Sequence, residues 1–491
     1  MVASYSCHSL RSKAILQKPD CRAAKFDVEP MYSTNTKNLG TKIKPARKYN
    51  LSMVFFDTPV GSVSSKILKL FCLKTRPLAV RKFCLTASGH SLNANSTISN
   101  KSVDSIQKPR SQRGHTMQTV KNFDRIGEEN AFAVLGRAGE LAAGGMDVIN
   151  LGIGQPDFPT PENIVEAAVR ALRDGHHGYT DATGILPLRE AVSADLYRRY
   201  QTEVSPANVL IVPGGKVTMF TAILMFGEPG AEILYPDPGF PIYRSMIEYT
   251  GATPIPVPIR EENGFAFSAD ETLKLIGPKT RLLILNSPAN PCGGITPRAE
   301  IDKLIAGLAH HPHVAILSDE IYDQMFYDGE KHVSLLSYPE IRNRLIVLNG
   351  WSKTYAMTGW RLGYSIWPDE LYNKARKLAV NAWSCVNAPA QYAAIEALTG
   401  PQDAVGKMVA EFDARRKSVV HLLNDLPGVS CIVPKGAFYA FPNISLTGWL
   451  AKDLARELLE KTGVATIGGP DFGTLGEGYI RISYANSQEN I

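Results

Sequence analysis

The sequence predicts an α/β protein in which helices cover both faces of a mostly parallel sheet. Short, almost wholly apolar runs bounded by Gly, Pro or Asp recur between residues 208 and 350. Such runs are typical of strands that are buried on both faces. Stretches with helical spacing of apolar residues separate several of them, as at 216–227 and 297–311. The apolar runs lie, in chain order, at residues 208–215, 231–239, 252–259, 281–288, 313–320 and 344–350.

Polar groups follow four of these runs at the point where each strand is expected to end. Because ligands bind at the carboxyl ends of the strands in such sheets, these groups are candidates for one site. A polar turn at the end of a strand explains any single case, but four cases together favour a site. The four groups are Gly214-Gly215-Lys216, the segment from Asn286 to Asn290, the pair Asp319 and Tyr322, and Lys353.

Charge divides the chain into two unequal parts. Residues 1–116 hold 20 Lys and Arg against 5 Asp and Glu, a net charge of +15, whereas residues 117–491 hold 33 against 42, a net charge of −9. The first part also holds 16 serines and lacks helical or strand periodicity, so we expect a disordered leader. This composition is typical of an organelle transit peptide, for a plastid rather than a mitochondrion. The alternatives are a plain disordered tail, or a cytoplasmic protein that begins at Met117.

Several classes of protein are not indicated. No run of 18 apolar residues is present, so no membrane-spanning helix is expected. The seven cysteines form no CxxC pair, which argues against a zinc site or disulfide framework and for a reducing compartment. The basic leader lacks a pattern of stacking aromatic residues, so nucleic-acid binding is not expected.

Lys353 follows the last apolar run and stands between Trp351 and Tyr355. Burial among aromatic side chains lowers the pKa of a lysine and makes its amine a nucleophile, which forms a Schiff base with a carbonyl group. Pyridoxal 5'-phosphate is the commonest biological aldehyde for this chemistry, and it requires an acid at its ring nitrogen and a cationic phosphate site. A plain surface lysine is the alternative.

The chain offers a residue for each of these requirements. Asp319 could keep a ring nitrogen protonated, although it could equally cap the following turn. Gly215 and Lys216 stand where a strand turns into a helix, and backbone N–H groups at such a position favour a phosphate. Arg361 adds a planar and permanently charged fork. A Gly-Gly turn alone is more often structural than functional.

Three motifs carry a resemblance to a known family. They are SPANPCGG at 287–294, SDEIY at 318–322 and SKTYAMTGWRLGY at 352–364. In this order and spacing they resemble class I aminotransferases of fold type I, in particular the bacterial-type aspartate aminotransferases, from about residue 120 to the end. The resemblance implies a large cofactor domain at 160–400 with a seven-stranded, mostly parallel sheet. It also implies a smaller α/β domain formed by 117–159 and 401–491.

The resemblance also implies roles around the cofactor. Lys353 matches the Schiff-base lysine and Asp319 the partner of the ring nitrogen. Tyr322 and Asn290 match the residues that contact the phenolic oxygen of the ring. The remaining matches are Phe240, which stacks on the ring, and Gly215, Lys216 and Arg361, which lie near the phosphate.

Four residues match positions that concern the substrate or a second subunit. Arg481 matches the arginine that binds the α-carboxylate in a bidentate pair, and Gly154 matches backbone that closes over the substrate. Lys216 could bind a distal carboxylate, although a solvent-facing lysine is as plausible. Tyr179 matches a tyrosine that reaches the cofactor phosphate of the partner subunit, which implies a homodimer.

The sequence departs from the family pattern in three places. Gly350 stands where some relatives have a phosphate-binding serine, so one contact is expected to be missing or replaced. Cys292 stands where threonine is common, and we expect it to pack rather than react. The chain ends at SQENI, where relatives continue into an amphipathic helix, so a truncation that uncovers core beside Arg481 is an open alternative.

The implied function is an aminotransferase that moves an amino group from an L-amino acid to a 2-oxo acid in two half-reactions. Lys216 favours aspartate or glutamate, while prephenate, aromatic amino acids and alanine remain open. Another enzyme of the same fold, such as a carbon–sulfur lyase, a decarboxylase or a synthase, is the main alternative. A nucleic-acid-binding arm on an idle body is a rival from a different class.

Overall fold

The computed structural model describes residues 117–491. The basic leader lies outside the described residues. The expectations that it is disordered and that it is a transit peptide for an organelle therefore stay predictions. Within the described part, no helix is long and apolar enough to cross a membrane.

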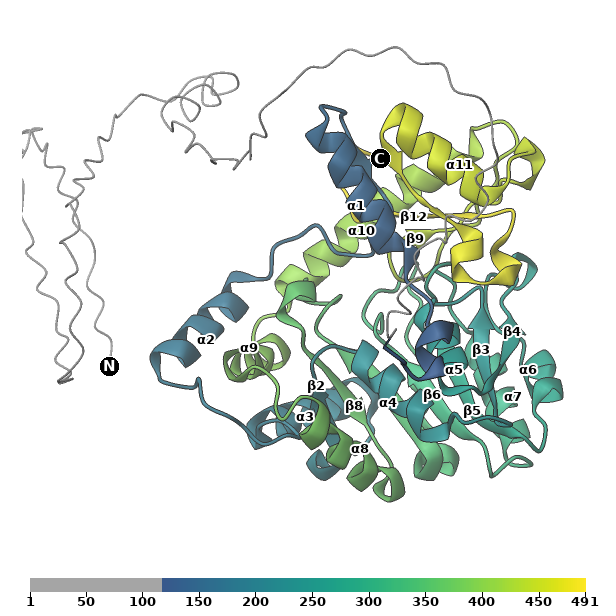
Figure 1. Cartoon of the computed structure of the whole chain (residues 1–491). Helices are drawn as coiled ribbons and strands as arrows, with labels where there is room; N and C mark the ends of the chain where they lie inside the picture. Colours follow the sequence, from purple (N-terminus) through teal and green to yellow (C-terminus); the bar gives the residue numbers. More distant parts are fainter. Residues whose placement is uncertain (1–116) are drawn as a thin grey trace, which may run out of the picture. The chain divides into compact units, whose positions relative to one another are not determined.

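A seven-stranded sheet forms the centre of the fold (Figure 1). Its order is β2-β8-β7-β6-β5-β3-β4, and β8 alone runs antiparallel to its neighbours. The predicted α/β class and mostly parallel sheet are therefore confirmed. The strands are β2 (Val209–Val212), β3 (Glu232–Asp237), β4 (Thr253–Pro258), β5 (Thr280–Asn286), β6 (Ala315–Asp319), β7 (Leu345–Gly350) and β8 (Gly363–Ile366).

Each of the six predicted runs forms one strand of this sheet, whereas β8 was not predicted. β8 has only four residues, Gly-Tyr-Ser-Ile, and three of them are not aliphatic. It becomes a strand because it pairs with β2 on one side and with β7 on the other. This pairing is known only from the tertiary structure.

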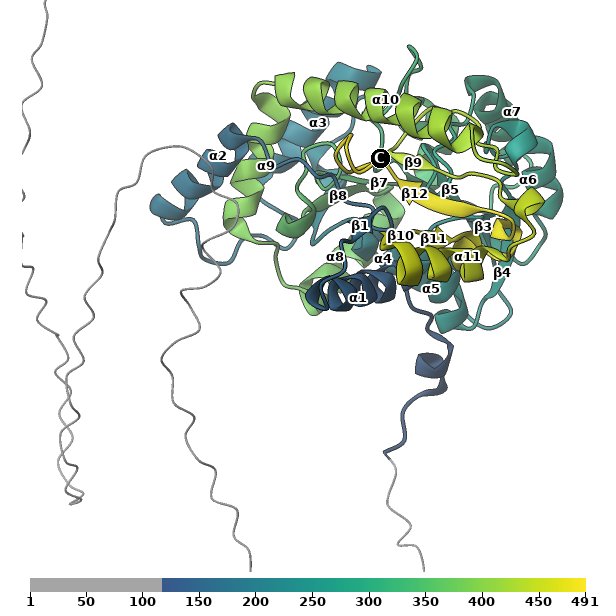
Figure 2. The same cartoon turned by 90° about the horizontal axis from the view of Figure 1, so that it is seen from above.

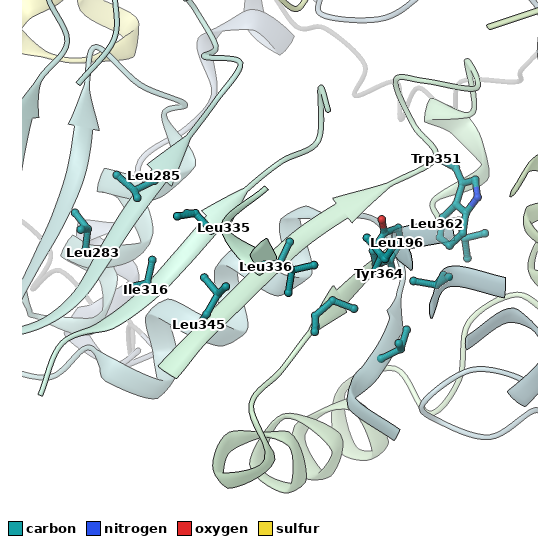
Figure 3. Close-up of a cluster of buried hydrophobic side chains, with 14 of the residues drawn as sticks. Leu196, Leu283, Leu285, Ile316, Leu335, Leu336, Leu345, Trp351, Leu362 and Tyr364 are labelled. Atoms are coloured by element: carbon teal, nitrogen blue, oxygen red, sulfur yellow. The ribbon is translucent and has the colours of Figure 1, made fainter. Parts of the chain in front are cut away.

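Helices cover both faces of the sheet because side chains alternate along each strand. Leu283, Leu285 and Ile316 point into one apolar layer, part of which is shown in Figure 3, while Leu282 and Ile284 point into the other. The first layer includes residues of α3 (Leu186–Tyr200), α7 (Arg298–Leu308) and α9 (Ala388–Thr399). The second layer includes residues of α4 (Lys216–Phe226), α5 (Ile242–Thr250) and α8 (Asp369–Ala382).

A second, smaller set of strands is built from both ends of the described chain. β1 (Ile149–Asn150) pairs with β10 (Val464–Ala465), so a segment that precedes the large sheet meets one that follows it. The order β11-β12-β9 describes an antiparallel sheet of β9 (Tyr439–Ala440), β11 (Ile467–Gly468) and β12 (Ile480–Ser483). Domain boundaries near 160 and 400 stay a prediction.

The remaining helices lie beside these sheets. In Figure 2 the long helix α10 passes along the side of β9, and α1 lies next to β10 and β11. These helices are α1 (Asn130–Ala143), α2 (Glu162–Arg173), α6 (Ala269–Leu275), α10 (Asp403–Asn424) and α11 (Ala451–Glu457).

Candidate active site

A cavity of about 440 Å³ lies at the carboxyl ends of β5, β6 and β7. Tyr439 of β9 and Arg481 of β12, which belong to the smaller set of strands, line the cavity from the other side. Every predicted site residue except Tyr179 lines it. The lining residues that were predicted are Gly154, Gly215, Lys216, Phe240, Asn290, Asp319, Tyr322, Lys353, Arg361 and Arg481.

Lys353 follows the end of β7 by three residues, and its ammonium group faces the cavity. Nζ donates a hydrogen bond to the carbonyl oxygen of Gly154. Burial, together with the positive charge of Arg481, lowers the pKa of Lys353 from 10.5 to about 8. At pH 7 about a tenth of the Lys353 side chains are therefore the neutral, nucleophilic amine, and the direction of the pKa shift is the one that the sequence predicted.

Asp319 is the last residue of β6 and is almost completely buried. Its Oδ2 accepts a hydrogen bond of 2.6 Å from the hydroxyl of Tyr243, and its Oδ1 accepts one of 3.2 Å from the backbone N–H of Ile321. Burial raises the pKa of Asp319 to about 6, while the bond from Tyr243 acts in the opposite direction. A cation beside this carboxylate would relieve the cost of its burial.

The first turn of α4 and Arg361 form the end of the cavity that the sequence assigned to a phosphate. Gly215 precedes α4, and no side chain caps this helix, so the N–H groups of Gly215 and Lys216 are available to an anion. Gly214 has φ +91°, and a Cβ there would lie 2.3 Å from Nη2 of Arg361. Any other residue at position 214 would be strained at this φ, and its Cβ would displace the guanidinium group. Arg361 itself donates to the carbonyl oxygen of Thr358 at 2.8 Å.

Two tyrosines meet inside the cavity. The hydroxyls of Tyr322 and Tyr439 lie 2.7 Å apart, and burial raises the pKa of both phenols. Gly154 passes so close that a Cβ there would lie 2.2 Å from the hydroxyl oxygen of Tyr439. Both hydroxyls stay protonated at neutral pH. One of them donates to the other, so the second O–H group is left to donate a hydrogen bond to a ligand.

Arg481 in β12 is only 2 % exposed, yet its charge is not neutralised by any carboxylate within residues 117–491. Nη1 donates to Oδ1 of Asn290 at 2.9 Å, and Nη2 donates to the carbonyl oxygen of Gly152 at 2.5 Å. The guanidinium carbon lies 4.7 Å and 4.6 Å from the ring centroids of Tyr439 and Phe472. Its Nε has no partner. Because a buried, unpaired charge is costly, this side chain is prepared for an anion.

Lys216 has a partner that the sequence did not predict. Its Nζ lies 2.5 Å from Oε2 of Glu129, which immediately precedes α1. The ammonium also lies 5.3 Å and 5.2 Å from the ring centroids of Phe132 and Phe240. Phe240 thus contacts Lys216 besides lining the cavity.

Sequence reasoning missed several side chains of the cavity, among them Glu129, Tyr243 and Tyr439. Tyr243 lies three residues after Phe240, so helical spacing could have pointed to it. Tyr439 and Glu129 come from segments that are distant in sequence and carry no motif. Gly350, the departure from the family pattern, is also explained: a Cβ there would lie 2.9 Å from Cα of Gly363 in β8. Cys292 is buried, in agreement with a packing role.

Comparison with known proteins identifies the family. The model of the aminotransferase class I and II family matches residues 146–491. The aspartate aminotransferase of Pyrococcus horikoshii is 42 % identical over 348 residues, which is 70 % of this chain and 88 % of that protein. Aromatic-amino-acid aminotransferase 2 of Thermococcus litoralis is 39 % identical over 72 % of this chain and 91 % of that protein. The crystal structure of the aspartate aminotransferase from Rhizobium meliloti superimposes with a TM-score of 0.72 and 33 % identity, covering 76 % of this chain and 96 % of that one.

The chain belongs to the aminotransferase class I and II family, with the fold of type I pyridoxal-phosphate enzymes. It is a transaminase that acts on amino acids and 2-oxo acids, and the family implies pyridoxal phosphate as the cofactor. The cavity fits this group. A depressed lysine pKa, a buried carboxylate, a glycine-lined helix start beside Arg361 and a buried arginine with an unpaired N–H all occur in one enclosed space.

Proposed function

We propose that the cavity binds pyridoxal phosphate through Lys353 and transfers the amino group of aspartate or glutamate to a 2-oxo acid. The observation that carries this proposal is the pairing, in one cavity, of a lysine with a pKa of about 8 and a buried arginine without a carboxylate partner among the described residues. An α-amino acid offers one group for each, because its amine reacts where Lys353 lies and its carboxylate suits Arg481.

Several other residues of the cavity would each hold one part of the cofactor. When bound, pyridoxal phosphate supplies an aldehyde that takes up an amino group and a ring that withdraws electrons from the substrate's Cα. Asp319 would lie at the ring nitrogen, and Tyr322 and Asn290 at the ring oxygen. Phe240 would lie against the ring face. The N–H groups of Gly215 and Lys216 and the guanidinium of Arg361 would bind the phosphate, since all are donors at one end of the cavity.

Lys353 would act a second time as the proton carrier. Its free amine would take up the proton from Cα of the substrate and pass it on to the carbon that carried the cofactor's aldehyde group. A pKa of about 8 suits this role, because a general base works best when its pKa is near the working pH. Such catalysis typically contributes about 10²–10⁴-fold.

The choice of aspartate rests on Lys216, which lies in the cavity where it could bind a distal carboxylate. Relatives named aspartate aminotransferases support this choice. An aromatic donor is the second candidate, because the rings of Phe132 and Phe240 flank the same lysine. The relative from Thermococcus litoralis, named for aromatic amino acids, agrees with that alternative.

The test compares donors and acceptors in the purified protein. We expect amino-group transfer from aspartate that requires 2-oxoglutarate and that a Lys353→Ala variant loses. Release of ammonia without an acceptor would instead indicate a lyase of the same fold. Normal turnover by the Lys353→Ala variant would contradict the proposed role of this lysine.

A homodimer is part of the proposal. Tyr179 is 94 % exposed and lies outside its own cavity, which is compatible with a contact to the cofactor phosphate of a partner subunit. Mixing Lys353→Ala and Tyr179→Ala subunits should restore activity, because a mixed dimer then holds one complete site. As a control, mixing Lys353→Ala and Arg481→Ala subunits should restore nothing, because these two residues serve the same site. Equal activity of both mixtures would refute the shared site.

A further inference from the structure

Arg481 and Lys216, the two groups in the cavity proposed to bind carboxylates of the substrate, differ in whether an acidic side chain of the protein already pairs with them. Arg481 has no acidic partner among residues 117–491, whereas Lys216 is already paired with Glu129 at 2.5 Å. The side chain of Glu129 is 16 % exposed and that of Lys216 is 41 % exposed, so the pair lies at the mouth of the cavity. A ligand with a single carboxylate meets a free partner at Arg481, but a second carboxylate meets an occupied one.

With this pair in place, the wall beside Lys216 is neutral and aromatic. The ammonium lies between the rings of Phe132 and Phe240, at 5.3 Å and 5.2 Å from their centroids. Met219 and Ile153 line the same cavity. A wall of this composition suits an apolar or aromatic side chain of the substrate, because no charge there is left without a partner.

Glu129 can leave this position at little structural cost. Although it is the residue before α1, its side chain caps none of the N–H groups of that helix. The chain on either side is held independently, by a hydrogen bond of 2.8 Å from the N–H of Gly127 to Ser245 and one of 2.7 Å from Asn130 to Asp471. Rotation of the Glu129 side chain alone therefore exposes Lys216 to a competing carboxylate.

We infer that Glu129 determines specificity as an internal carboxylate that competes with the distal carboxylate of the substrate for Lys216. With Glu129 in place, the site takes amino acids with apolar or aromatic side chains. When the distal carboxylate of a dicarboxylic amino or oxo acid replaces Glu129, Lys216 holds it instead. This inference rests on the proposed function, because it requires the α-carboxylate to lie at Arg481.

The test measures binding of two non-reacting ligands to the holoenzyme by calorimetry. Maleate carries two carboxylates, whereas 3-phenylpropionate carries one carboxylate and an aromatic side chain. In a Glu129→Gln variant we expect maleate to bind about fivefold more tightly, the change that removal of one partly exposed ion pair produces. The kcat/KM ratio of aspartate to phenylalanine should rise by a similar factor. Binding of 3-phenylpropionate should gain nothing.

Two further variants make the result specific. Glu128→Gln removes the same charge from the exposed neighbouring residue, which does not line the cavity, and should leave the affinity for maleate unchanged. Adding Lys216→Met to Glu129→Gln should abolish the gain. If Glu129→Gln binds maleate equally or more weakly than the wild type, the inference is wrong. The proposed function is tested separately, by whether amino transfer in the wild-type protein requires a 2-oxo acid acceptor. Its failure would therefore be distinguished from a failure of the inference about Glu129.

Discussion

Replacing Arg481 by lysine keeps the positive charge but removes the planar fork that would bind the α-carboxylate. Nη1 and Nη2 are both oriented by acceptors, Asn290 at 2.9 Å and Gly152 at 2.5 Å, and two aromatic rings hold the guanidinium between them. A lysine ammonium cannot make two parallel hydrogen bonds to a carboxylate. The variant should therefore lose at least one charge-assisted hydrogen bond, worth about 1.5–3 kcal/mol, which corresponds to about 10- to 150-fold in kcat/KM.

The assay is steady-state kinetics of Arg481→Lys with aspartate and with phenylalanine. Both donors carry the same α-carboxylate, so both values of kcat/KM should fall by a similar factor. Arg416→Lys is the matched control: this arginine is equally buried but pairs with Asp328 and Asp413 outside the cavity. It should lower the melting temperature without a comparable loss of kcat/KM in the folded protein. A normal kcat/KM for Arg481→Lys, or a loss with one donor only, would refute the reasoning.

Three other changes test separate parts of the cavity. Gly214→Ala should weaken pyridoxal phosphate binding at least about tenfold in equilibrium dialysis, because its Cβ would meet Arg361 at 2.3 Å and φ is +91°; unchanged affinity would argue against this phosphate site. Tyr243→Phe removes a hydrogen bond that lowers the pKa of Asp319, so the acidic limb of the pH profile of cofactor binding should move to higher pH, and a shift to lower pH would contradict the assignment. In cofactor-free protein, the pKa of Lys353 is about 8 when folded and 10.5 ordinarily. The unfolded chain thus binds more protons between these values, and stability should rise with pH through that window by up to about 3 kcal/mol. Denaturant titrations at pH 7.5 and 10 should show this rise in the wild type and a smaller one in Lys353→Met.

Much of the central sheet could be predicted because its strands are buried on both faces. A strand in that position must be apolar along its whole length, so its bounds are visible in one short window of sequence. β8 was missed because it is short and contains Gly363, Tyr364 and Ser365, which show no such run. Its conformation depends on the pairing with β2 and β7 rather than on its own composition.

The site residues that were predicted are those that follow strands or belong to a motif. Lys353 and Asp319 are placed by the local rule that ligands bind at carboxyl ends of strands. Tyr439 and Glu129 approach the same cavity from segments 86 residues after and 224 residues before Lys353. A short window of sequence does not contain residues that lie so far apart in the chain. The contact of Tyr439 with Tyr322 and that of Glu129 with Lys216 could therefore not be predicted.

The sequence by itself determined the class of fold, the family, and the chemical types that the site contains, because these depend on short-range patterns. Only the tertiary structure decided the charge state of those groups and which of them are free. Burial sets the pKa of residues 353 and 319. The pairing of residue 216 with an acid 87 positions earlier distinguishes it from the arginine in β12, a buried cation without a carboxylate partner among the described residues. Desolvation and Coulomb interactions depend on distances in space, and these distances cannot be read from a short stretch of sequence.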